Sequence, residues 1–112
     1  MKIIIQGRNI VLTSAIKTYI GTKLGALGKF VKRWDGGGAA ILRVEVSRAT
    51  RHHKKGDVFY AEANLDIPGT LLRAEAYDTD ARLAVNVIRK TLELEIKRRK
   101  EREERGRRPV SR

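Results

Sequence analysis

The sequence predicts an α+β domain with the element order β-α-β-β-β-α, in which a four-stranded sheet carries two helices packed on one face. Two kinds of apolar spacing lead to this prediction. Three central segments alternate between apolar and polar residues, which indicates strands with one buried face, and two other segments repeat apolar residues every three or four positions, which indicates helices. A chain of 112 residues is long enough for one domain with a modest core.

The first strand and the first helix follow one another closely. Residues 2 to 6, KIIIQ, are rich in β-branched side chains and end at Gly7, which favours a short strand. Thr13 or Ser14 is expected to cap the helix that follows. One face of this helix would be buried, because the spacing of three and four continues through Ile16, Tyr19, Ile20, Leu24, Leu27, Phe30, Val31 and Trp34.

Three glycines interrupt this helical segment. At about 100° per residue, Gly21, Gly25 and Gly28 fall together on the face opposite the apolar one. Each costs about 1 kcal/mol relative to alanine. The first helix is therefore expected to be weakly stable, or to present a face that another molecule approaches closely. The sequence DGGG at residues 35–38 should end it.

Three strands are predicted between residues 39 and 77. Segments 39–47 and 58–67 alternate, joined by a basic connection over 48–57, and Pro68 with Gly69 marks a tight turn into the segment 70–77. Consecutive strands joined in this way form an antiparallel meander. The side chains expected to point into the core are Ala40, Leu42, Val44, Val46, Phe59, Ala61, Ala63, Leu65 and Ile67.

The last helix is predicted to begin near Thr79. One arc of it is apolar, formed by Ala81, Ala84, Val85, Ile88, Leu92 and Ile96, and Leu83, Val87 and Leu94 widen this arc on one side. We expect the widened arc to lie against both the sheet and the first helix. Residues 1–100 would then form the folded domain, with both helices on one sheet face and the other face bare, and residues 101–112 a flexible basic tail.

The chain is strongly basic. Lys and Arg number 25 against 13 Asp and Glu, for a formal charge of +12 and a pI near 10.6. Such an excess favours a polyanionic partner. On the last helix, pairs four residues apart, Glu93 with Lys97, Glu95 with Arg99 and Glu101 with Arg105, would neutralise part of the charge. Because Arg82, Arg89 and Lys90 lack such a neighbour, a polyanion-contacting face is favoured over a merely solvated one.

Other classes of function find little support. The chain has no cysteine, so disulfides and thiolate metal sites are excluded, and its longest apolar runs are far too short for a signal peptide or membrane span. We expect a cytoplasmic protein with no cofactor, no membrane partner and no small-molecule substrate. Asp78 and Asp80 fit a helix cap better than a catalytic pair. His52 and His53 fit a solvated loop better than a metal site. An enzyme is not predicted.

Three stretches together resemble a known family, the ribosome hibernation-promoting factors, also called ribosome-associated inhibitors or the sigma-54 modulation family. They are GRNIVLTSAIKTYIGTKLGALGKF, the turn PG, and LRAEAYDTDARLAVNVIRKTLELEIKRRK. The resemblance covers residues 1 to about 100. It includes the turn at Gly7 to Asn9, the pair Lys23 and Leu24, and the helix cap Asp80. Arg82 and Asn86 depart from the pattern, since many members have an aromatic residue and an aspartate there.

The resemblance implies a fold like that of a double-stranded-RNA-binding domain and a ribosomal partner. Members bind the small ribosomal subunit and the 70S ribosome in the channel for messenger and transfer RNA, and hold idle ribosomes inactive in stationary phase or under stress. Contacts to 16S ribosomal RNA would come from basic residues of the two helices, with Arg8 as a further candidate for phosphate or backbone carbonyls. The candidate RNA-binding residues are thus Arg8, Lys23, Arg82, Arg89, Lys90, Lys97 and Lys100.

Three alternatives stay open at this point. Lys23 lies within the apolar arc of the first helix, so its aliphatic stem would pass along Tyr19 and Leu27 whether or not its amine meets RNA. The whole chain could also be a protein-interaction module that modulates a transcription factor through the bare sheet face. Arg48, Arg51, Lys54 and Lys55 of the basic connection fit an RNA contact and a solvated hairpin tip equally well.

Overall fold

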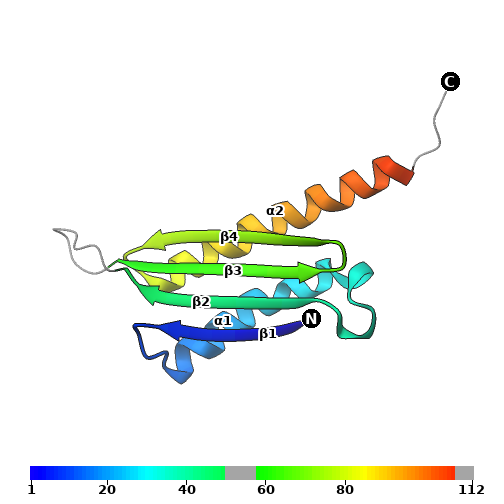
Figure 1. The fold of residues 1–112 in the computed structure, drawn as a ribbon. Helices are drawn as coiled ribbons and strands as arrows, with labels where there is room; N and C mark the ends of the chain where they lie inside the picture. The colour runs from blue at the N-terminus through cyan, green and yellow to red at the C-terminus, as the bar shows by residue number, and fades with distance from the viewer. Residues whose placement is uncertain (50–57, 108–112) are drawn as a thin grey trace.

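The computed structural model describes residues 1–49 and 58–107 (Figure 1). The predicted element order is confirmed, with additional 3₁₀ turns between the first helix and the second strand. Within the described residues no helix is long and apolar enough to span a membrane. In chain order the elements are β1 (Lys2–Arg8), α1 (Ser14–Gly25), three 3₁₀ helices η1 (Ala26–Phe30), η2 (Lys32–Trp34) and η3 (Gly36–Gly38), β2 (Ile41–Arg48), β3 (Phe59–Ile67), β4 (Thr70–Asp78) and α2 (Ala81–Arg107).

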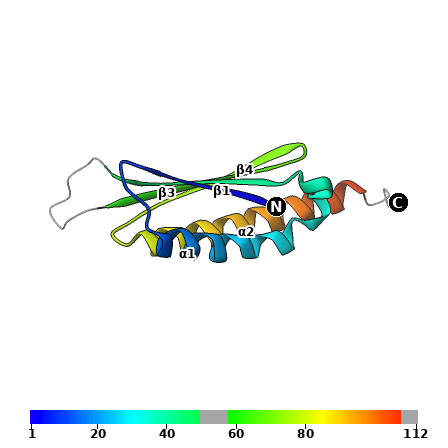
Figure 2. The same cartoon turned by 90° about the horizontal axis from the view of Figure 1, so that it is seen from below.

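The four strands form one mixed sheet in the order β1-β2-β3-β4. Strand β1 pairs with β2 in parallel, and this requires a crossover, which α1 supplies. The β2–β3 and β3–β4 pairs are antiparallel, as the meander predicts, and Gly69 at the tight turn between β3 and β4 has a φ of 84°. Both helices lie on one face of the sheet, and the other face is bare (Figure 2).

The core lies between the sheet and the helices. Every side chain predicted to point inward from β2 and β3 is buried, apart from Phe59, which is half-buried. The helices contribute Ile20 and Leu24 from α1 and the predicted arc of α2, in which Ile88, Leu92 and Ile96 are fully buried. Strand alternation and helical spacing therefore locate the core correctly.

The first helix is shorter than predicted. Its start is confirmed, since the Thr13 hydroxyl accepts a hydrogen bond from the Ile16 amide at 3.2 Å, but the α-helix ends at Gly25 instead of continuing to Trp34. Glycines at positions 25 and 28 weaken the helix just where the chain tightens into 3₁₀ turns. The apolar face persists through this change, because Leu27, Val31 and Trp34 are still buried.

The second helix, α2, is one long continuous helix. The Asp80 side chain accepts a hydrogen bond from the Arg82 amide at 2.9 Å, which confirms the predicted cap. The helix continues to Arg107, so residues 101–107 extend it beyond the domain boundary drawn at residue 100. Flexibility of the tail beyond Arg107 stays a prediction, because residues 108–112 lie outside the described part of the chain.

One predicted contact of α2 is wrong. Leu83, Val87 and Leu94 were expected to widen the buried surface, yet about half of each side chain is exposed. Helix α1 packs on the opposite flank of α2, where Tyr19 meets Asn86. The three aliphatic residues therefore form a strip on the outer surface of the molecule, which we call the aliphatic strip.

Candidate nucleic-acid interface

Charge is unequally divided between the two layers of the fold. The four strands together carry five basic and five acidic residues, so their charges cancel. Residues 14–34 carry five basic residues and no acidic one, and α2 carries ten basic residues against five acidic. We call residues 14–34 and 81–107 the helical layer. It holds a net charge of +10 out of the +12 of the whole chain.

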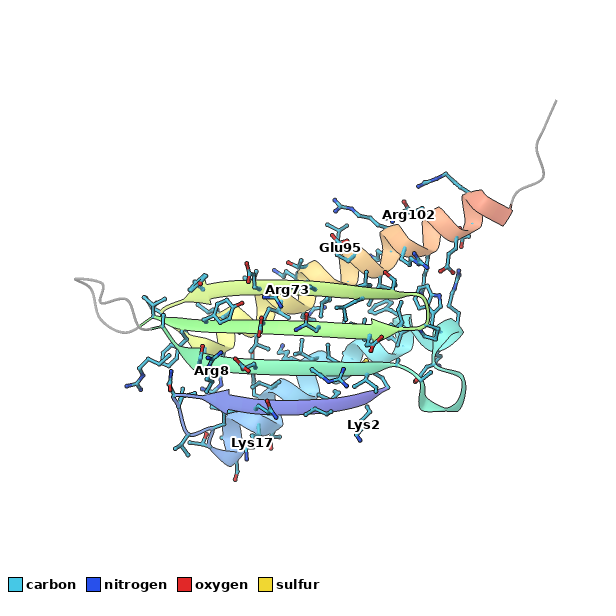
Figure 3. The ribbon with its side chains drawn as sticks, viewed as in Figure 1. Lys2, Arg8, Lys17, Arg73, Glu95 and Arg102 are labelled. Atoms are coloured by element: carbon cyan, nitrogen blue, oxygen red, sulfur yellow. The ribbon has the colours of Figure 1, made fainter. Side chains whose placement is uncertain are left out.

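The bare sheet face is neutralised by its own ion pairs. Arg73 lies 2.6 Å from the Glu62 carboxylate and 3.3 Å from that of Glu75. The other two arginines on this face also have carboxylate partners, Arg8 with Glu45 at 3.7 Å and Arg43 with Asp66 at 4.0 Å. Figure 3 shows Arg8 and Arg73 over the sheet, with Lys17 and Arg102 on the helices. This face therefore has little electrostatic attraction for a polyanion.

A tyrosine on the same face reinforces this pairing. The Tyr60 hydroxyl donates to the Glu75 carboxylate at 2.6 Å and to the Glu62 carboxylate at 3.1 Å. Burial raises the pKa of Tyr60, and the two carboxylates raise it further. The hydrogen bond from Tyr60 and that from Arg73 lower the pKa of Glu75, which keeps this carboxylate charged. Tyr77 packs against Tyr60 with ring centres 4.8 Å apart and ring planes tilted by 47°.

Two predicted RNA-binding residues meet at the junction of the helices. The Lys23 amine lies 5.7 Å from the centre of the Tyr19 ring, and the Arg82 guanidinium lies 5.3 Å from the same centre. The Tyr19 hydroxyl donates to the Asn86 side chain at 2.9 Å, which fixes the ring between the helices. Neither cation forms an ion pair within the described residues, so both keep their charge available to a partner.

The middle of α2 differs from the sequence prediction in two respects. Arg89 does have an acidic neighbour, because its guanidinium lies 3.0 Å from the Glu93 carboxylate, and Lys97 shares the same carboxylate at 3.6 Å. Glu95 pairs with Arg98 at 3.2 Å instead of the expected Arg99. Lys90 is exposed and forms no ion pair within residues 1–49 and 58–107. It is the least neutralised cation in this part of the helix.

The end of α2 is held against the 3₁₀ segment. The Trp34 indole donates to both Glu103 carboxylate oxygens, at 3.0 and 3.2 Å, and Arg99 donates to Glu103 at 3.0 Å. Burial opposes ionisation of Glu103, but the hydrogen bonds from Trp34 and Arg99 outweigh it and hold its pKa below the usual value. Lys100 lies over Phe30 and Trp34, 5.9 Å from each ring centre. These contacts keep the basic end of the helix in place.

The structure therefore brings six of the seven candidate residues together. Lys23 and the five candidates of α2 lie in the helical layer, whereas Arg8 lies on the bare sheet face beside Glu45. Lys23 is exposed and its amine lies over Tyr19, as expected for a lysine whose stem passes along the apolar arc of α1.

Sequence reasoning missed further basic residues of this layer. Lys17, Lys29 and Lys32 are exposed and form no ion pair among the residues described. The signal that could have found them is the absence of any acidic residue between positions 14 and 34.

Only one candidate residue of the basic connection between β2 and β3 lies within the described residues. Arg48 lies over the Phe59 ring, 5.9 Å from its centre. The candidates Arg51, Lys54 and Lys55, and the pair His52 and His53, lie outside the described residues. In the part of the chain that the structure describes, no group of three or more His, Cys, Asp or Glu side chains could hold a metal ion.

Comparison with known protein families gives a match over most of the chain. The family model described as sigma 54 modulation protein / S30EA ribosomal protein matches residues 3–104. The chain belongs to this family. The match includes both helices and all four strands, and thus the whole helical layer up to Glu104.

Solved structures similar to this chain include two ribosome-related proteins. The N-terminal domain of Thermus thermophilus Protein Y is 31% identical, with a TM-score of 0.71, over 88% of this chain and 98% of that one. A ribosomal subunit interface protein from Coxiella burnetii is 18% identical, with a TM-score of 0.72, over 90% of this chain and 99% of that one. The second likeness supports the S30EA-family fold alone. No curated protein matches the chain.

Proposed function

We propose that this protein binds the small ribosomal subunit through its helical layer and keeps idle ribosomes inactive. The observation that carries the proposal is the division of charge, +10 on the helical layer against zero on the strands. Cations held on one surface neutralise phosphates and release counterions, which supplies most of the affinity for RNA. Family membership favours ribosomal RNA as the polyanion, because the description of the family names an S30EA ribosomal protein.

The proposed mechanism is steric. The helical layer faces 16S ribosomal RNA in the channel for messenger and transfer RNA, and the folded domain excludes the ligands that translation needs. Lys23, Arg82 and Lys90 supply charges that no carboxylate of the described residues neutralises. No catalytic step is involved. The protein would act in the cytoplasm, on 30S subunits and on 70S ribosomes.

Co-sedimentation tests this function. The protein should pellet with 30S and 70S particles at modest salt and be released as salt rises. Addition of transfer RNA and messenger RNA in excess should displace it, because the proposed site overlaps theirs. A protein that stays in the supernatant with both particles, or that binds without competing with either RNA, contradicts the proposal.

Two observations favour a second function. The family description also names sigma 54 modulation, and the bare sheet face is self-neutralised, with Tyr77 and Leu71 mostly exposed on it. A protein-interaction module would use this face to dock on a transcription factor. Substitution of Tyr77 and Leu71 would abolish that interaction and leave ribosome binding unchanged, so the two functions can be separated.

A further inference from the structure

The end of α2 has no apolar side chain to hold it against the core. Ile96 is the last residue of this helix in the buried core, and the segment 97–107, KRRKEREERGR, contains seven basic residues, three acidic ones and one glycine. We call residues 97–107 the basic arm. Figure 1 shows this end of α2 extending past the sheet. Because a helix end without buried apolar contacts frays readily, the arm needs another anchor.

Glu103 supplies that anchor. Its carboxylate accepts hydrogen bonds from the Trp34 indole of η2 at 3.0 and 3.2 Å and from Arg99, one turn earlier in α2, at 3.0 Å. The Arg33 guanidinium lies 3.7 Å from the same carboxylate, and the Glu103 side chain is only 20% exposed. Apart from Arg33 with Glu104 at 3.5 Å, no other hydrogen bond among the described residues joins the arm to a different element.

The exposed arginines of the arm lie on the side away from this anchor. At 100° per residue, Arg98, Arg102 and Arg105 fall within an arc of about 60°. The centre of this arc is about 130° from Glu103 around the helix axis. Arg98 pairs with Glu95 at 3.2 Å. Arg102 and Arg105 form no ion pair within the described residues, so their charges are available to phosphates.

We propose that Glu103 is a positioning residue for RNA binding, which raises the affinity of the basic arm for ribosomal RNA although it carries the same sign of charge as RNA. An arm that is already helical loses less conformational entropy when it binds than a frayed one. Without Glu103 the arm would fray, and Arg102 and Arg105 would have to be ordered at the moment of contact. The inference rests on the proposed function and adds the arm to its RNA-binding surface.

Charge alone predicts the opposite sign. A carboxylate near an RNA-binding surface repels phosphates, so its removal should strengthen binding. Removal of Glu103 would also release Arg99 and Arg33 from their ion pairs, which adds to this effect. Alanine is moreover a better helix former than glutamate. A loss of affinity in Glu103→Ala therefore comes neither from net charge nor from helix propensity.

The test measures binding to 30S subunits with a matched control. At 0.1 M salt Glu103→Ala should weaken binding about sixfold, the contribution of one phosphate contact, and the salt slope should fall by slightly less than one. Glu101→Ala is the control, because Glu101 is an exposed residue of the same arm and forms no ion pair within the described residues. It should strengthen binding. Circular dichroism of the free proteins should show a loss of helix in Glu103→Ala alone.

A second background shows whether Glu103 acts through the arm. Arg102→Ala/Arg105→Ala removes the two cations that Glu103 is proposed to position. In this background the additional effect of Glu103→Ala should fall from about sixfold to less than about twofold, because coupled residues are not additive. A general weakening of the fold would instead reduce the affinity by the same factor in both backgrounds.

Three results would overturn the inference while the proposed function stands. They are unchanged or stronger binding of Glu103→Ala, equal weakening by Glu103→Ala and Glu101→Ala, and an undiminished effect of Glu103→Ala in the Arg102→Ala/Arg105→Ala background. In all three the wild-type protein still binds 30S subunits. A wild-type protein that does not bind them overturns the inference and the proposed function together.

Discussion

Lys90 offers the sharpest test of the basic surface of α2. It is exposed and forms no ion pair within the described residues, so Lys90→Ala removes a cation without leaving a carboxylate unpaired. Surface changes of this kind alter the free energy of unfolding by less than about 0.5 kcal/mol. Arg89 is a poorer choice, because its loss would free the Glu93 carboxylate as well.

The expected loss of affinity follows from counterion release. One phosphate contact contributes a salt slope of about 0.7 to 0.9, which is equivalent to about sixfold in affinity at 0.1 M salt relative to 1 M. Lys90→Ala should therefore weaken binding to 30S subunits about sixfold at 0.1 M salt and have almost no effect near 1 M. The plot of log affinity against log salt should become less steep by slightly less than one.

The assay is a salt titration of binding with a matched control. Lys2→Ala removes the same charge from β1, where Lys2 is exposed and forms no ion pair within the described residues, and it should leave both affinity and slope unchanged. Equal effects of the two substitutions would mean that only net charge matters. An unchanged slope for Lys90→Ala would place the RNA contact elsewhere. Either result refutes the reasoning.

Three further predictions concern stability. Gly21→Ala should stabilise the fold by about 0.5 to 1 kcal/mol in urea denaturation, because a Cβ there meets nothing within 4 Å. Leu92→Ala should cost about 2 to 5 kcal/mol in the same assay, because Leu92 is fully buried. The pKa of Glu103 is lower in the folded protein than in the unfolded chain. Glu103 therefore stabilises the fold at pH values above its unfolded pKa, and this stabilisation is lost as the pH falls through its folded pKa. Fluorescence of Trp34, the single tryptophan, should follow that loss, and Glu103→Gln should remove the step.

Two of these outcomes discriminate between explanations. If Gly21→Ala stabilises the fold but weakens ribosome binding, the glycine face of α1 is approached closely by the subunit. If the fluorescence step persists in Glu103→Gln, another group near Trp34 causes it. The indole contact would then not report on the end of α2.

Spacing within a segment predicted the strands and helices well. Alternation located the inward side chains of β2 and β3, and the Asp80 cap marked the start of α2, because both signals depend on neighbours in the sequence. The end of α1 was harder to predict from the sequence. Intervals of three and four residues bury Leu27, Val31 and Trp34 in a continuous α-helix as well as in successive 3₁₀ turns, so the pattern cannot distinguish the two.

Relations between elements were harder to predict. The wide apolar arc of α2 indicated a neighbouring helix but not the flank on which it lies, and α1 took the flank of Asn86, which left Leu83 and Val87 exposed. The Trp34 to Glu103 contact joins residues 69 positions apart and has no local signal. The pairing of Arg89 with Glu93 fits the four-residue spacing, but the sequence prediction paired the Glu93 carboxylate with Lys97 alone, whereas it contacts both cations.

The division of charge between the layers also gives the molecule an electric dipole, directed roughly along the normal to the sheet. In the field of a polyanion such a dipole experiences a torque, which rotates the helical layer toward the polyanion before the two surfaces touch. A protein with the same +12 spread evenly would be attracted equally but would arrive in random orientations. Productive encounters should therefore form a larger share of all collisions, and this share should fall as added salt screens the field.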